Sequence, residues 1–317
     1  MGAHRVGALA RRLESLLIPL VVVIGALGVA VPGPGRTVDG TVAIDLTLAV
    51  LVFTAGLAIE VITDIAAVRA RSARLVVVIA VSTATLPLLA WLLGHLVSTG
   101  YRGGILAVGV APSEVAAVGL VGMAGGEVAV AASLLVASSI VTVLVAGPIL
   151  EALADVPTLH PLGLLLTLTI VVAIPLAAGA GLRRLLDGKG QLLDAARLVG
   201  LVALLVLLWQ VDSRVQLRLS YLGVAAVLLG LLAGSSVLGW LLARALPQAA
   251  RSAVLLPVAM RDFAVAAGIA ASAFGPGATG PLGIYGLLVL VFGAAAARLA
   301  SSSRPKCAGR RALWRGQ

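Results

Sequence analysis

The chain has 317 residues, of which 61% are hydrophobic and only 11% are charged. A soluble domain carries about 25% charged residues, so water cannot be the solvent for most of this surface. The net charge of +10 could indicate nucleic-acid binding, but no nucleic-acid-binding motif accompanies it. A lipid bilayer fits the composition, and each helix that crosses it needs about 20 apolar residues.

Apolar runs separated by charged or Gly/Pro-rich segments predict an all-α integral membrane protein with ten transmembrane helices. The first run follows Arg5, Arg11 and Arg12 and lacks a clear cleavage site, so we expect a retained span rather than a signal peptide. The run at 196–211 is the shortest. The expected spans are 15–32, 42–64, 74–98, 103–124, 127–150, 161–182, 196–211, 220–242, 252–274 and 280–299.

The positions of the basic residues predict the orientation of these spans. If the N-terminus is cytoplasmic, Arg261 lies within a span, 18 of the other lysines and arginines lie in inner segments and 4 lie in outer segments, as the positive-inside rule favours. We therefore expect a multi-pass protein of the inner (plasma) membrane with both termini in the cytoplasm. The basic residues left in outer segments are Arg36, Arg102, Arg214 and Arg218.

Five spans in each half would give two similar halves opposite orientations, as in the inverted repeats of secondary transporters. The stretch 111–119 in the fourth span resembles 259–267 in the ninth, and this match places Glu114 on Asp262. The expected units are a five-span repeat at 1–150, an inverted five-span repeat at 151–300 and a basic cytoplasmic tail at 301–317.

Three charged residues lie inside otherwise apolar runs: Glu114, Arg261 and Asp262. A charge near the bilayer centre costs about 2.5–3.5 kcal/mol on insertion scales, so such groups pair with one another or line a wet cavity. We interpret the three as a substrate-binding or ion-coupling site. The alternative is a structural ion pair in which Arg261 and one carboxylate lock two helices together.

Helix breakers accompany these charges. Pro112 precedes Glu114, and Pro257 precedes Arg261. Proline removes a backbone donor, so both spans are expected to unwind there, and the N-terminus of a half-helix would suit an anionic substrate. The residues expected to break the helices or line the cavity are Pro112, Ser113, Pro257, Met260, Ser82 and Thr83, with Ser235 and Ser236 as further hydroxyls.

Other polar residues predict no further site. The three histidines lack metal-ligand spacing and Cys307 is the single cysteine, so we expect no metal and no cofactor. No nucleophile–base pair is evident, so we do not expect an enzyme. Asp45 is expected at the outer edge of the second span, and Glu60 and Asp64 near its inner end, within reach of Arg69 or Arg71.

Several stretches resemble the bile acid:sodium symporter family, which lies within a wider group that includes arsenite effluxers. They are 53–57 (FTAGL), 87–93 (PLLAWLL), 109–112 (GVAP) and the Ala/Ser-rich fifth span. The resemblance covers nearly the whole chain. It implies ten spans in two inverted five-helix repeats, with broken fourth and ninth helices that cross. It also implies a panel domain and a core domain that provide alternating access.

The sodium ligands of that family are replaced. Ala117 and Val118 stand where its members have Ser and Asn, and Ala131 and Leu135 occupy the hydroxyl positions of the fifth span. In the ninth span the family's Glu-x-x-x-Gln-Asn becomes Pro257 followed by Arg261-Asp262, and Ser82 replaces a Gln of the third span. A hard cation needs several oxygen ligands, so sodium coupling is not expected. The span-four cysteine of the arsenite effluxers is also absent.

These residues lead to one main hypothesis. The chain is a secondary active transporter of a small organic anion, coupled to protons or running as a uniporter, in which Arg261 meets the anion and Glu114 or Asp262 carries the proton. Its expected partners are this anion, protons and the lipid bilayer, with no nucleic acid. The alternatives are a sodium-coupled organic anion symporter with non-standard ligands and a non-transporting sensor or scaffold on the same fold.

Overall fold

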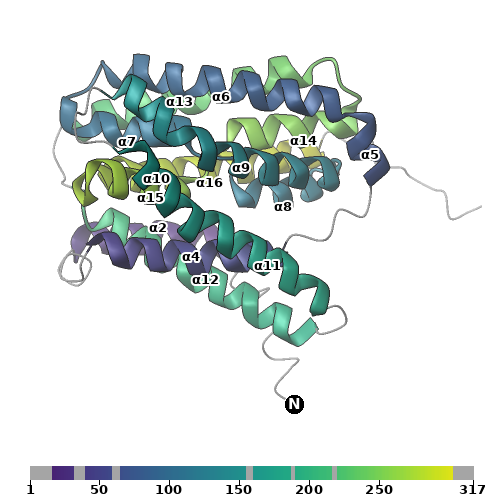
Figure 1. Cartoon of the computed structure of the whole chain (residues 1–317), viewed down its shortest axis with the longest axis horizontal. Helices are drawn as coiled ribbons and strands as arrows, with labels where there is room; N and C mark the ends of the chain where they lie inside the picture. Colours follow the sequence, from purple (N-terminus) through teal and green to yellow (C-terminus); the bar gives the residue numbers. More distant parts are fainter. Residues whose placement is uncertain are drawn as a thin grey trace, which may run out of the picture.

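The computed structural model describes residues 16–31, 40–58, 65–154, 160–186, 190–215 and 220–302. Within these ranges the chain is helical, apart from an isolated β-bridge between Ser113 and Arg261 (Figure 1). The helices are α2 (Leu17–Ala30), α4 (Gly40–Ala58), α5 (Ile65–Ala70), α6 (Ser72–Gly94), α7 (Thr99–Val110), α8 (Val115–Met123), α9 (Val128–Leu153), α10 (Pro161–Leu168), η1 (Thr169–Ala173), α11 (Ile174–Leu185), α12 (Gly190–Asp212), α13 (Ser220–Ala243), α14 (Gln248–Ala259), α15 (Phe263–Phe274), η2 (Pro276–Thr279) and α16 (Gly280–Ser302).

Six helical passes in the described part of the chain are long and apolar enough to cross a bilayer. Their outward positions carry large apolar side chains such as Leu92 and Leu222, which are 60% and 69% exposed and so suited to lipid. Shorter apolar helices occupy other predicted spans, and the chain is a multi-pass membrane protein. The six passes are Ser72–Gly94, Val128–Leu153, Pro161–Leu185, Gly190–Asp212, Tyr221–Ala243 and Pro276–Ala296.

Several helices differ from the predicted spans at their ends. The predicted span 196–211 belongs to α12, which has 23 residues and begins six residues earlier, at Gly190. Its first turns include the ion pair Arg197–Asp194 (3.5 Å). Helix α4 ends at Ala58, so Glu60 and Asp64 lie outside the described residues. The predicted spans 103–124 and 252–274 are each interrupted, as described below.

A π-helical turn, η1, divides the pass from α10 to α11. It lies directly before Pro175, which is near the start of α11. Proline has no N–H and its ring clashes with the carbonyl of the preceding turn, and a wider π turn relieves that clash while the chain stays helical. The pass Pro161–Leu185 therefore stays helical from end to end.

The helices form two layers (Figure 1). We call α2, α4, α11 and α12 the first layer, and α6, α7, α9, α13, α14 and α16 the second layer. Within the first layer α4 packs against both α11 and α12. A Cβ added at Gly56 would lie 2.5 Å from the carbonyl oxygen of Leu176, so only glycine allows α4 and α11 to approach so closely.

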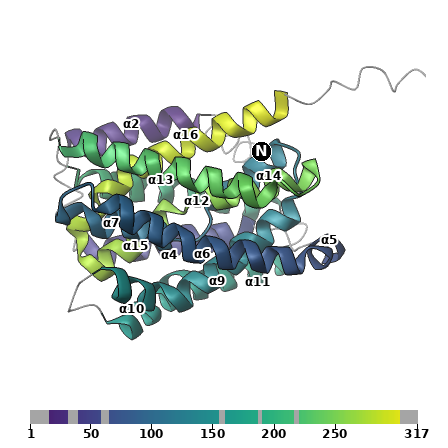
Figure 2. The ribbon, with the colours of Figure 1, turned by 90° about the horizontal axis from the view of Figure 1, so that it is seen from above.

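The second layer repeats this close packing. A Cβ at Gly109 of α7 would lie 2.5 Å from that of Ala90 in α6, and one at Gly239 of α13 would lie 2.8 Å from the carbonyl oxygen of Leu255 in α14. Figure 2 shows α16 of this layer running beside α2 of the first layer, and the two helices are in contact. The layers therefore meet at α16, and α15 also packs against α4 of the first layer.

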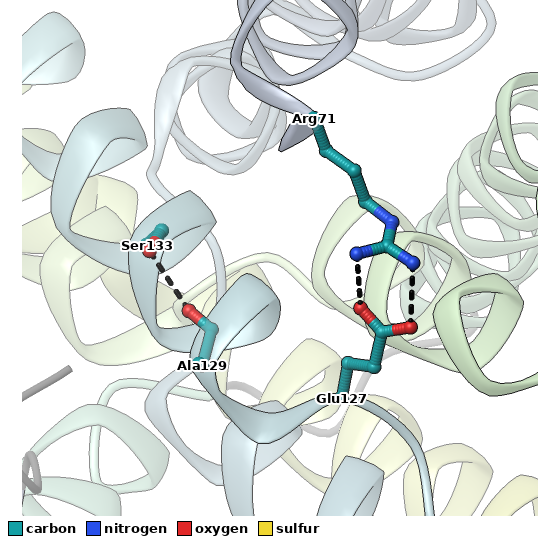
Figure 3. Close-up of polar contacts among 4 residues, drawn as sticks. All are labelled: Arg71, Glu127, Ala129 and Ser133. Carbon is teal, nitrogen blue, oxygen red and sulfur yellow. Dashed lines mark hydrogen bonds and ion pairs between the residues drawn. The ribbon is translucent and has the colours of Figure 1, made fainter. Parts of the chain in front are cut away.

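An ion pair ties two helix starts together at one end of the second layer (Figure 3). Arg71, directly before α6, binds Glu127, directly before α9, through two contacts of 2.8 Å. Each side chain is about one quarter exposed (23% and 24%), so the pair lies at the edge of the protein. This carboxylate is a partner for Arg71 that the sequence did not predict.

Candidate functional site

Two helical passes are interrupted, and the interruptions bind each other. The first interruption, 111–114, separates α7 from α8, and the second, 260–262, separates α14 from α15. The Glu114 N–H donates to the Met260 carbonyl and the Asp262 N–H donates to the Pro112 carbonyl, both at 2.9 Å. Unpaired backbone groups are costly in lipid, so each interruption satisfies the other. We call this region the crossing.

Hydroxyl groups of α9 hold the first interruption. Thr142 Oγ1 donates to the Val110 carbonyl at 3.1 Å, where α7 ends. The Ser113 N–H donates to Ser138 Oγ at 3.1 Å, and the two serine hydroxyls are 3.2 Å apart. All of these groups are buried, so these bonds replace the helical bonds that α7 loses at its end.

Helices α13 and α16 hold the second interruption. Ser235 Oγ of α13 donates to the Ala259 carbonyl at 2.9 Å, where α14 ends. The Arg261 N–H donates to the hydroxyl oxygen of Tyr285 in α16 at 3.2 Å, and Tyr285 is fully buried. Ser138 and Tyr285 therefore have equivalent roles, because each hydroxyl oxygen accepts a backbone N–H from one of the two interruptions.

The three intramembrane charges meet at the crossing. Glu114, Arg261 and Asp262 are only 6%, 4% and 4% exposed, so no aqueous phase reaches them in this conformation. Arg261 donates from its guanidinium to the Ala111 carbonyl of the opposite interruption. Its Nε is buried and has no hydrogen bond. Among the described residues no ion pair joins Arg261 to either carboxylate, so the alternative of a locking ion pair is not formed here.

The two carboxylates cap their helices differently. Asp262 Oδ1 accepts hydrogen bonds from the N–H groups of Ala264 and Val265, both at 2.9 Å, and so caps α15. Glu114 Oε1 accepts one long bond of 3.5 Å from the Ala116 N–H in α8, and the N–H groups of Val115 and Phe263 also lie near this carboxylate. Its Oε2 is buried without a hydrogen bond. Because Asp262 occupies the N–H groups of Ala264 and Val265, the first turn of α15 does not offer them to an anionic substrate, contrary to our expectation.

Three of the four residues expected to break the helices lie in the interruptions, and the fourth lies inside a helix. Pro112, Ser113 and Met260 lie in the interruptions, whereas Pro257 lies inside α14, ahead of the point where the helix ends. A proline can remain in a membrane helix when neighbouring groups compensate for its missing donor. The second interruption therefore begins later than the proline suggested.

The predicted hydroxyls are also divided. Ser235 reaches the crossing, but Ser236 donates to Leu232 and Ser82 donates to Ile79 within their own helices. Thr83 is half-buried one position further along α6. Sequence reasoning missed Ser138, Thr142 and Tyr285. A signal existed for Tyr285, because it is one of only three tyrosines in the chain and lies in an apolar run.

Apolar membrane-crossing helices around two paired interruptions define a membrane transporter as the class of protein. The model of the sodium bile acid symporter family matches residues 45–225, more than half of the 317 residues. The chain belongs to this family. No curated protein matches the chain. The matched region contains Glu114 and ends ahead of α14, so Arg261 and Asp262 lie beyond it.

Proposed function

We propose that the chain is a secondary active transporter that moves a small organic anion by alternating access, coupled to protons or running as a uniporter rather than coupled to sodium. The observation that carries the proposal is Glu114 at the crossing, whose carboxylate accepts a single long bond of 3.5 Å at Oε1 and leaves the buried Oε2 without a hydrogen bond. A buried carboxylate that lacks hydrogen bonds is costly when ionised. Proton uptake removes that cost, so Glu114 is suited to carry the coupling proton.

The proposed architecture is ten spans in two inverted five-span repeats, at 1–150 and 151–300, followed by a basic cytoplasmic tail. Matched contacts support it. Helix α6 packs against α7 as α13 packs against α14, and α8 packs against α9 as α15 packs against α16. The N–H groups of Ser113 and Arg261 are bound in the same way by hydroxyls of α9 and α16. Such symmetry is typical of transporters with a site at the repeat interface.

Within this architecture the first layer, together with α10, is the panel and the remaining helices are the core. Motion of the core against the panel would expose the crossing first to one side of the membrane and then to the other. The distribution of arginines supports an inner-membrane orientation with both termini in the cytoplasm. The pair Arg71–Glu127 would then lie at the cytoplasmic end of the core.

Arg261 would bind the anion. Its guanidinium has a buried Nε without a partner and so retains a donor for a carboxylate or similar group. Asp262 is less suited to carry the proton, because its cap on α15 depends on both bonds to its carboxylate. In this assignment the second interruption binds the anion through Arg261, and the first interruption carries the proton on Glu114.

Sodium coupling is disfavoured by the residues at the family's ligand positions. Ala117, Ala131 and Leu135 are buried apolar side chains and offer no oxygen beyond the backbone. The hydroxyls nearest the first interruption, Ser138 and Thr142, are already bonded to protein groups. Ser138 Oγ also accepts the Ser113 N–H, which leaves this oxygen only one further lone pair for a cation.

The test begins with a thermal-stability screen of organic anions, with and without sodium and at two pH values. The stabilising anions are then supplied to proteoliposomes under an imposed pH gradient or an imposed sodium gradient. We expect uptake that responds to pH and ignores sodium. Uptake driven by sodium and indifferent to pH would support the alternative symporter. The sensor or scaffold alternative would be supported if no anion is transported and Glu114→Gln changes only stability.

A further inference from the structure

A third acidic side chain is buried, away from the crossing. Asp212 is the last residue of α12 and is 6% exposed. Among the described residues no hydrogen bond or ion pair to its carboxylate is found. A lone acid within a membrane protein is a functional candidate by default, because burying it without a partner is costly.

Glycines from two helices form the surroundings of Asp212. A Cβ added at Gly25 of α2 would lie 2.9 Å from Asp212 Oδ2, and one at Gly28 would lie 2.8 Å from Asp212 Cβ. A Cβ at Gly283 of α16 would overlap the carboxylate. The carboxyl group therefore packs directly on backbone from α2 and α16. Since α2 and α12 belong to the first layer and α16 to the second, Asp212 lies in the seam between the layers, where Figure 2 shows α2 beside α16.

The packed helices supply no basic partner. Helices α2 and α15 contain no ionisable side chain, and α4 contributes only the acid Asp45. Helix α16 carries Tyr285, whose hydroxyl is occupied by the Arg261 N–H, and Arg298 near its far end. On α12 itself Asp194 and Arg197 pair with each other near the opposite end. Arg214 lies two positions beyond the end of α12.

We propose that Asp212 is a proton-binding latch in the seam between α12, α2 and α16. The neutral carboxyl group fits the closed seam. The ionised group needs water, which reaches it only if α16 moves away from the first layer. A rise in pH therefore favours an open seam and a fall in pH favours the closed conformation. This inference rests on the proposed alternating access and adds a second proton site to it, distinct from Glu114.

Trp209 offers a direct readout of the seam. It lies one turn before Asp212 on α12, and a Cβ at Gly28 would lie 3.1 Å from its ring. With Trp91, Trp240 and Trp314 replaced by Phe, quenching of Trp209 fluorescence by acrylamide reports water access at the seam. We expect quenching to increase severalfold from acidic to mildly alkaline pH in the protein with Asp212. Asp212→Asn should keep quenching low at every pH.

Asp45→Asn is the matched control, because it removes another partly buried acid from a first-layer helix. It should leave the pH response intact. Asp212→Ser is a second neutral variant in case the amide disturbs folding. A pH response that persists in both neutral variants, or one that follows sodium instead of pH, would overturn the latch. The quenching assay contains no substrate, so the pH dependence of Trp209 quenching should survive Glu114→Gln. Failure of the latch can therefore be separated from failure of the proposed transport.

Discussion

The two interruptions have the same backbone arrangement and different chemistry. Each exchanges one N–H and one carbonyl with the other, each is held by a hydroxyl from a neighbouring helix, and each ends on an acid that caps the next half-helix. Asp262 caps α15 with two bonds of 2.9 Å, whereas Glu114 makes one bond of 3.5 Å. The second interruption also carries Arg261, where the first has Ser113.

This difference indicates that Asp262 and Glu114 have different roles. An acid with two good hydrogen bonds from a helix N-terminus is stabilised as an anion and acts as a structural cap. An acid with an unbonded buried oxygen gains most from taking up a proton. Although the two backbones are symmetric, Asp262 can therefore serve as a fixed cap while Glu114 binds and releases a proton. The following substitutions test this difference between the two interruptions.

The largest effect is expected at Arg261. Arg261→Met should reduce anion uptake about a hundredfold, the equivalent of losing one charged hydrogen bond of nearly 3 kcal/mol. Arg251→Met, near the start of α14, the half-helix that ends before Arg261, is the control and should transport normally. Uptake by proteoliposomes at a substrate concentration well below saturation measures both. Normal uptake by Arg261→Met would remove the anion-binding role from the second interruption.

The cap of α15 should have the next largest effect. Asp262→Ala removes the acceptor for two N–H groups and should cost about 1–2 kcal/mol of stability. Asp262→Asn keeps an acceptor and should recover most of that loss. Thermal unfolding in detergent compares the two variants. If both are equally unstable, the charge of Asp262 matters more than its hydrogen bonds, and the contrast with Glu114 weakens.

The supporting hydroxyls should have the smallest effects. Ser138→Ala and Tyr285→Phe each remove the acceptor for one backbone N–H, at the first and second interruptions respectively, and should cost about 1 kcal/mol each. Thermal unfolding of the single and double variants gives their sizes. Similar losses would confirm equivalent support for the two interruptions, whereas a loss confined to one variant would contradict it.

The sequence predicts the membrane class, the interrupted spans and the correspondence of Glu114 with Asp262, because each follows from local composition. It does not predict the groups that support the crossing. Ser138 and Tyr285 act through single bonds to residues 25 and 24 positions away, which no local pattern records. Asp212 lies at the end of an apolar run, where an acid is usually exposed, and only packing against Gly283 shows that it is buried.

Glu114→Gln tests the central claim most directly. Glutamine preserves the size of the side chain and an oxygen for Ala116, but it cannot release a proton. We predict that this variant exchanges the anion across proteoliposome membranes at the normal rate and no longer accumulates it under an imposed pH gradient. Accumulation that persists under the pH gradient would contradict the assignment of Glu114 as the proton carrier.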